Sequence, residues 1–155
     1  MPIEKKIKAY VDDFVRQNKA AQAMERHLKT AGIGIRPVVD HITFRTNDVE
    51  KRTKEFTSEG FVWDSTLGNK GIIEYNDWWA KVYRRPGFPA IFIDQAYEGK
   101  RGESSLIPAW VKRFGDKTFH HVAIAVDDIE ESIEALKKLG IECAGEIVGA
   151  RGSDL

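Results

Sequence analysis

Two histidines occupy equivalent positions in two copies of one sequence pattern. Residues 40–61 read DHITFRTNDVEKRTKEFTSEGF, and residues 120–141 read HHVAIAVDDIEESIEALKKLGI, so that His41 matches His121 without a gap. The other recurring residues are Asp48 with Asp128, Glu50 with Glu130, and Gly60 with Gly140. Neutral imidazole is a good ligand for divalent transition metals. The repeat therefore suggests a metal site to which each copy contributes one histidine.

The period of each copy indicates which way these histidines point. Each copy begins with the alternation of a strand and then changes to the spacing of a helix. Successive side chains of a strand face opposite sides, so His41, Thr43 and Arg45 share one face of the first strand. The alternate residues are apolar and must pack on the helix that follows, which leaves His41 and His121 facing a cavity. With one carboxylate, two such histidines would make the facial triad of non-haem iron(II).

The remaining elements predict an α+β fold built from paired modules. Residues 3–31 have helical spacing with a break near Asn18. Three strand candidates, 71–75, 78–85 and 90–96, follow the first copy of the repeat and complete a βαβββ module. The expected organisation is a helical extension over 1–36, a first βαβββ module over 37–97, a connection over 98–117, and an apparently incomplete second module over 118–155. Only the start of one more strand is expected within GEIVGARGSDL.

Arg45 breaks the symmetry of the repeat, because its counterpart is Ala125. It lies on the face of His41, about 13 Å further along the strand. An arginine that points into a cavity is costly unless it is paired. Its partner is either a substrate carboxylate bound through two hydrogen bonds, or a neighbouring Asp or Glu. Thr43 lies between the two residues and could donate a hydrogen bond, so Thr43 and Arg45 are the candidate substrate-handling residues.

The doubled unit with a histidine on each first strand resembles the vicinal oxygen chelate superfamily, which includes glyoxalase I and the extradiol dioxygenases. HHVAIAVDDIEESIEALKKLGIE carries most of the resemblance and VDHITFRTND supports it; the second stretch is most similar to 4-hydroxyphenylpyruvate dioxygenases. The resemblance implies metal ligation by His41, His121 and a Glu on the last strand of the second module, for which the sequence up to Leu155 has no counterpart. Glyoxalase-like members take a carboxylate from the first module instead. Asp94, on the last strand of the first module, is the matching residue here. The alternative interpretation is that Asp94 is a surface or strand-end aspartate with no role in metal binding.

The resemblance implies an iron(II)-dependent dioxygenase acting on a 2-oxo acid or a related carboxylate. Manganese(II), zinc(II), nickel(II) and cobalt(II) are the alternative metals. A glyoxalase-like lyase or isomerase that uses a divalent metal is the second interpretation. A small-molecule-binding member without catalytic activity is the third, although such members often lack the histidines.

Composition narrows the class of protein. The chain of 155 residues has 24 basic and 24 acidic side chains, and this balance argues against a nucleic-acid partner. No apolar run approaches the length of a membrane span, and the first residues lack the apolar region of a signal peptide. The single cysteine, Cys143, excludes an internal disulfide and fits a reducing, cytoplasmic setting. An incomplete second module would leave an unpaired strand edge, which favours a homodimer.

Overall fold

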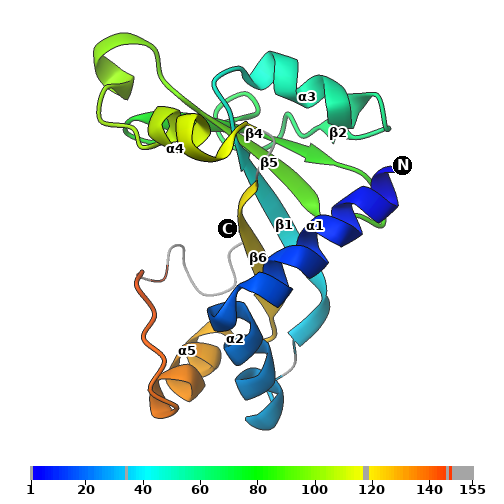
Figure 1. Ribbon diagram of the computed structural model, residues 1–155, viewed down its shortest axis with the longest axis vertical. Helices are drawn as coiled ribbons and strands as arrows, with labels where there is room; N and C mark the ends of the chain where they lie inside the picture. The colour runs from blue at the N-terminus through cyan, green and yellow to red at the C-terminus, as the bar shows by residue number, and fades with distance from the viewer. Residues whose placement is uncertain (1, 34, 117–118, 146, 148–155) are drawn as a thin grey trace. The chain divides into compact units, whose positions relative to one another are not determined.

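The computed structural model describes residues 2–33, 35–116, 119–145 and 147. Its elements are α1 (Ile3–Gln17), α2 (Lys19–Thr30), β1 (Ile35–Arg45), α3 (Val49–Thr57), β2 (Val62–Trp63), β3 (Ile72–Glu74), β4 (Trp78–Arg84), β5 (Ala90–Ala96), the 3-10 helix η1 (Gly99–Gly102), α4 (Ile107–Phe114), β6 (Phe119–Val126) and α5 (Ile129–Lys138) (Figure 1). The predicted α+β class is confirmed. The helical start, its break at Asn18 and the three strand candidates after the first copy of the repeat are also confirmed.

Within the described residues, six strands form one mixed sheet. The order is β2-β4-β5-β1-β6, and β3 pairs with β4. β1 is parallel to β5, whereas β4 is antiparallel to β2, β3 and β5. β1 and β5 therefore lie side by side with their carboxyl ends at the same edge.

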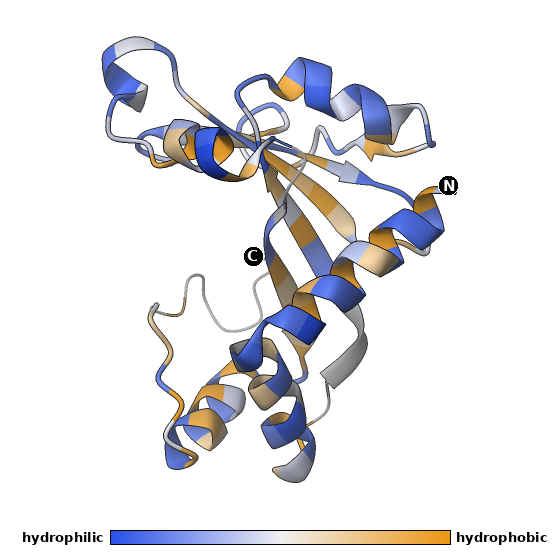
Figure 2. Cartoon of the chain, in the orientation of Figure 1, coloured by the Kyte–Doolittle hydropathy of each residue, from blue (hydrophilic) through white to orange (hydrophobic). Residues whose placement is uncertain are grey.

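The described chain divides into two compact units, which lie within residues 1–11 with 37–125 and within residues 12–36 with 126–155. The first unit contains most of the sheet. One face of β1 and β5 is apolar, and α1 and α3 supply apolar side chains to the same core. Figure 2 shows bands of hydrophobic residues along β1, β5 and α1. The buried members of this core are Ile3, Ile7, Ile42, Phe44, Val49, Phe56, Phe61, Tyr83, Ile91 and Ile93.

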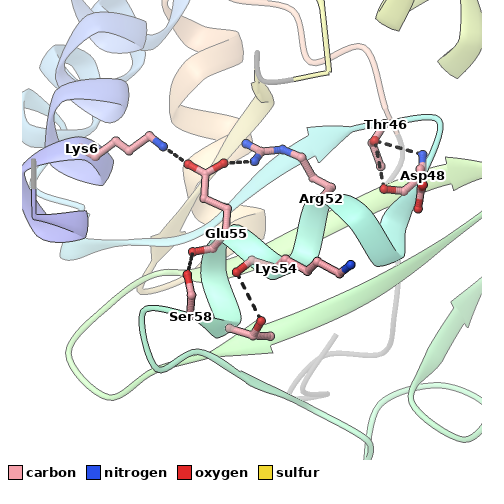
Figure 3. A network of polar contacts seen from close by, with 8 residues as sticks. Lys6, Thr46, Asp48, Arg52, Lys54, Glu55 and Ser58 are labelled. Atoms are coloured by element: carbon pink, nitrogen blue, oxygen red, sulfur yellow. Dashed lines mark hydrogen bonds and ion pairs between the residues drawn. The ribbon is translucent and has the colours of Figure 1, made fainter.

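A network of two ion pairs connects α1 to α3 within the first unit (Figure 3). Glu55 forms ion pairs with Lys6 of α1 and with Arg52, one turn earlier on α3. The Arg52 guanidinium lies 4.7 Å from the ring centre of Phe44 and 5.0 Å from that of Phe56. Arg52 is only 5% exposed, so Glu55 compensates a buried positive charge.

The two copies of the repeat begin and end their helices in the same way. Asp48 and Asp128 are the N-caps of α3 and α5, and each carboxylate accepts a hydrogen bond of 2.9 Å from the backbone amide three residues later. Gly60 and Gly140 follow the helices at φ values of 85° and 76°, a region that favours glycine. The recurring aspartates and glycines of the repeat therefore begin and end equivalent helices.

The second unit pairs α2 with α5. Leu28 of α2, Ile33 and Leu136 of α5 form its buried apolar cluster. Asn18 caps α2, because its side chain accepts a hydrogen bond of 3.0 Å from the amide of Ala21. Residues 148–155, which include part of the expected additional strand, lie outside the described residues. Across the described chain, every helix is too short or too polar to cross a membrane.

Candidate functional site

The polar side chains predicted to share a face do so. Because Ile42, Phe44, Ile91 and Ile93 fill the core, the alternate residues of β1 and β5 face the other way. This second face, here called the histidine face, consists of His41, Thr43 and Arg45 of β1, Phe92 and Asp94 of β5, and His121 of β6.

The sheet brings the two repeat histidines together. β6 is the neighbour of β1, and the ring centres of His41 and His121 lie 5.5 Å apart with the rings nearly perpendicular. Phe92 of β5 packs against His41 with a ring-centre distance of 4.3 Å. Two strands far apart in sequence thus place matching imidazoles in direct contact.

Each of these imidazoles is held at Nδ1 by the residue that precedes it. Oδ2 of Asp40 lies 2.7 Å from Nδ1 of His41. Nδ1 of His120 lies 2.9 Å from Nδ1 of His121. The repeat therefore aligns both the histidines and the partners that orient them.

The second nitrogen of His121 contacts Thr43. The Thr43 hydroxyl lies 3.0 Å from Nε2 of His121, and Thr43 as a residue is only 1% exposed. If His121 carries its proton on Nδ1, that proton goes to His120 and the Thr43 hydroxyl donates to Nε2. The other tautomer reverses both bonds.

Both histidines of β6 favour the neutral form. Burial is the main cause that lowers the pKa of His121 to about 4, and His120, His41 and Arg45 lower it further by charge repulsion. Burial, followed by repulsion from Arg45, lowers the pKa of His120 to about 4. Neutral imidazole is the form that binds metals.

A second cluster of polar side chains, separate from the two histidines, lies at the carboxyl end of β1. The parallel register pairs Arg45 with Asp94, while His41 pairs with Ala90. The indole ring of Trp110 covers the Arg45 guanidinium at 5.5 Å and meets the ring of His120 edge-on at 4.7 Å. Helix α4 therefore covers the histidine face at Arg45, and Figure 1 shows α4 and α3 on either side of β4 and β5.

Asp94 is a buried carboxyl group with incomplete hydrogen bonding. It is 2% exposed, and its Oδ1 atom has no hydrogen-bond partner. Burial raises the pKa of Asp94 to about 7, although the nearby Arg45 charge acts in the opposite direction. Burial also raises the pKa of Tyr75, and the Asp94 charge adds to the effect, which places the Tyr75 phenol near this carboxyl group.

The described residues supply only part of a metal site. Across residues 2–33, 35–116, 119–145 and 147, no three His, Cys, Asp or Glu side chains are placed to hold one ion. Asp94 lies opposite Arg45, four residues beyond His41 in register, so the structure does not bring its carboxylate to the two histidines.

Three side chains of this region were not singled out from the sequence as site residues. Alternation along the strand places His120 on the helix-packed face or at its edge, and its ring nitrogen Nδ1 contacts Nδ1 of His121. Trp110 was only part of a connecting helix, and Tyr75 was the end of a strand. The adjacent pair His120-His121 was the one local signal, because a second imidazole next to a metal-binding histidine is a natural hydrogen-bond partner.

Comparison with known proteins supports the fold alone. No protein-family model matches the chain, and no curated protein matches it. A solved structure from Shewanella frigidimarina, described as a "putative hydrolase", is similar with a TM-score of 0.57 and 19% sequence identity. The similarity covers 88% of this chain and 72% of that one. At this level of identity the likeness extends to the arrangement of helices and strands.

Proposed function

We propose that the chain carries the two-histidine part of an iron(II) site and belongs to a dioxygenase that acts on a 2-oxo acid or a related carboxylate. The observation that carries the proposal is the meeting of His41 and His121, from equivalent repeat positions, with each Nδ1 already held by the preceding residue. That arrangement leaves Nε2 of both rings as the atoms for a metal.

The separation of the rings is compatible with a shared ion. Two imidazoles that bind one metal through nitrogens about 2.1 Å from it have ring centres about 4.5 to 5.2 Å apart at N–metal–N angles of roughly 90° to 110°. The observed distance is 5.5 Å, so a small inward movement of the rings would be needed. The Thr43 hydroxyl currently engages Nε2 of His121, so it would have to turn away when an ion binds there.

A carboxylate outside the described residues would complete the triad in this proposal, and Asp94 is left out of it. When bound, iron(II) would supply open coordination positions at which a 2-oxo acid and dioxygen can meet. The chain's own contribution is to hold the His121 imidazole neutral, to orient both imidazoles at Nδ1, and to present Arg45 further along the same face.

Arg45 is the proposed anchor for a substrate carboxylate. Its Nε atom is buried without a hydrogen-bond partner, and Trp110 covers the guanidinium. An unpaired donor in such surroundings is costly unless an anion satisfies it. About 13 Å of strand separates the Cα atoms of Arg45 and His41. This span favours a substrate that reaches the metal with one end and Arg45 with the other.

The finer fold assignment is part of the same proposal. The order β1-α3-β3-β4-β5, with the two-residue strand β2 added after α3 and with β1 parallel to β5, supports a first module of the βαβββ type found in the vicinal oxygen chelate superfamily. The matching caps of α3 and α5 support a second module that begins at β6. The lyase or isomerase alternative rested on Asp94 as a metal ligand, and its position opposite Arg45 gives that alternative less support.

The proposal is tested by anaerobic titration of the metal-free chain with iron(II), and with cobalt(II), whose absorption spectrum reports its coordination. We expect one ion per chain, with affinity reduced at least about a hundredfold in His41→Ala and in His121→Ala. His27→Ala is the matched control, because His27 lies on α2 in the other unit. Unchanged binding in either repeat-histidine variant would overturn the shared site.

Oxygen consumption then separates the reaction classes. The iron-loaded chain is mixed with 2-oxo acids that carry a second carboxylate, and dissolved oxygen is followed with an electrode. Oxygen uptake that requires His41, His121 and Arg45 supports the dioxygenase. Oxygen-independent conversion of the same acids would favour the lyase or isomerase instead.

A further inference from the structure

The pair Arg45 and Asp94 is unusual because Asp94 is buried, Arg45 is half-buried, and each has a buried polar atom without a hydrogen-bond partner. They are directly opposite each other in the parallel pairing of β1 with β5. Nε of Arg45 and Oδ1 of Asp94 are buried atoms without a hydrogen-bond partner. Two opposite charges held close but not joined by a full set of hydrogen bonds stabilise each other only in part.

We propose that Asp94 is the proton-accepting partner of the Arg45 anion site, so that a carboxylate binding to Arg45 drives uptake of one proton by Asp94. This inference rests on the proposed role of Arg45 and adds a role for Asp94 that the metal site does not use. It makes anion affinity depend on pH through a residue that does not itself bind the anion.

The physical argument is a competition for one positive charge. An ionised Asp94 in a site with 2% exposure depends on Arg45 for compensation. When an external carboxylate pairs with the guanidinium, the Arg45 charge is neutralised and Asp94 would remain a buried anion beside a second anion. Buried like charges in contact cannot both stay ionised at neutral pH, so the buried carboxyl takes up a proton.

Among the titratable groups near Arg45, Asp94 is the one expected to take up a proton when an anion binds. The titratable groups near Asp94 and Arg45 are Tyr75 from the turn after β3, and His120 and His121 from β6. Burial and repulsion by Arg45 keep both histidines neutral at pH 7, and the pKa of Tyr75 is raised above its ordinary value of 10.0. Asp94, with a pKa raised to about 7, is already close to gaining a proton.

The linkage has a defined direction. Because binding raises the proton affinity of Asp94, protonation of Asp94 must raise the affinity for the anion by the same factor. Anion affinity is therefore expected to fall as the pH rises above about 7, by up to about tenfold per pH unit while uptake is close to one proton.

The experiment is calorimetric titration of the metal-free chain with glutarate, a dicarboxylate without an oxo group, at pH 6, 7 and 8. Buffers of different ionisation enthalpy at each pH report the number of protons taken up. For the wild type we expect close to one proton per glutarate at pH 8, and about fivefold weaker binding at pH 8 than at pH 7, because Asp94 of the free chain is already half protonated at pH 7. For Asp94→Asn we expect no uptake and an affinity that is the same at all three pH values. Glu98→Gln, which removes an exposed carboxylate, should behave as the wild type does.

The outcomes separate the two proposals. Glutarate binding without proton uptake in the wild type would overturn the role of Asp94 and leave the Arg45 site standing. Absence of binding at every pH in both the wild type and Asp94→Asn, with folding confirmed by circular dichroism, would overturn the Arg45 site and this inference with it. The double variant Arg45→Met/Asp94→Asn, which leaves no unpaired buried charge, must lose binding if glutarate occupies the site at Arg45.

Discussion

Nδ1 of His120 lies 2.9 Å from Nδ1 of His121, and the aligned pair Asp40 and His41 has the equivalent contact at 2.7 Å. A partner on Nδ1 decides which nitrogen of an imidazole is free to bind a metal. Although one partner is a carboxylate and the other an imidazole, both can accept the Nδ1 proton. The equivalence of function at equivalent repeat positions is the reason to regard these contacts as part of the site.

Replacing His120 with phenylalanine should weaken metal binding about ten- to a hundredfold, the range found when an outer partner of a metal ligand is lost. Phenylalanine keeps an aromatic ring against Trp110, with which His120 makes an edge-on contact at 4.7 Å. Anaerobic cobalt(II) titration measures the affinity, and nitrogen-15 NMR of the His121 ring reports its tautomer. An unchanged affinity together with an unchanged tautomer would exclude the positioning role.

In the first copy of the repeat, two variants of Asp40 test the corresponding partner of His41, again by anaerobic cobalt(II) titration. Asp40→Asn keeps an oxygen that can accept the Nδ1 proton of His41, whereas Asp40→Ala removes it. We expect the alanine variant to lose affinity and the asparagine variant to recover most of it. Equal loss in both variants would indicate that the charge of Asp40 matters more than its hydrogen bond.

Thr43→Val should strengthen metal binding and weaken the metal-free fold. In the metal-free chain the Thr43 hydroxyl lies 3.0 Å from Nε2 of His121, and an ion on that nitrogen must break the contact. Removing a hydrogen bond worth about 1 kcal/mol should raise the metal affinity about two- to tenfold and lower the free energy of unfolding by a similar energy. Weaker metal binding in Thr43→Val would mean that the hydroxyl supports the bound state instead.

Asp94→Asn should stabilise the chain increasingly as the pH rises from about 4 to 7. The pKa of Asp94 is raised from 3.8 to about 7 by burial, so over this range the folded chain retains a proton that the unfolded chain has lost. The free energy of unfolding of the wild type therefore falls as the pH rises, by at most about 1.4 kcal/mol per pH unit. Asparagine does not titrate, so Asp94→Asn removes this dependence on pH. Urea unfolding at pH 5, 6, 7 and 8 measures the difference, with Glu98→Gln as the control. A difference that is the same at every pH would contradict the raised pKa.

The elements and faces of the first unit could be predicted from the sequence because they follow local rules. Alternation placed Ile42 and Phe44 in the core and Thr43 and Arg45 on the other face, as observed. The caps at Asp48 and Gly60 depend only on residues within a few positions of the helix ends. The two-residue strand β2 is not among the three strand candidates, because so short a segment carries no period.

The composition of the site could be predicted only in part, because register is set by packing between segments that are distant in sequence. The alternation of β5 placed Asp94 on the correct face, but nothing local indicated that it would lie opposite Arg45. The position of Trp110 over Arg45 depends on how α4 packs on the sheet. The pleat divides the aromatic residues of β4 and β5: Tyr83 is in the core and Phe92 contacts His41.

Glu55→Gln should destabilise the first unit by up to about 3 kcal/mol, because it leaves the buried Arg52 guanidinium without its ion-pair partner. Glu55 also pairs with Lys6, so the variant loosens the connection between α1 and α3 shown in Figure 3. Glu59→Gln, an exposed change just beyond the same helix, is the control and should have little effect. Urea unfolding gives the free energies, and hydrogen exchange at the amides of α1 reports whether its attachment is weakened. If Arg52→Met, which removes the buried charge itself, is as destabilising as Glu55→Gln, the loss comes from packing around Arg52, and the unpaired charge is not its cause.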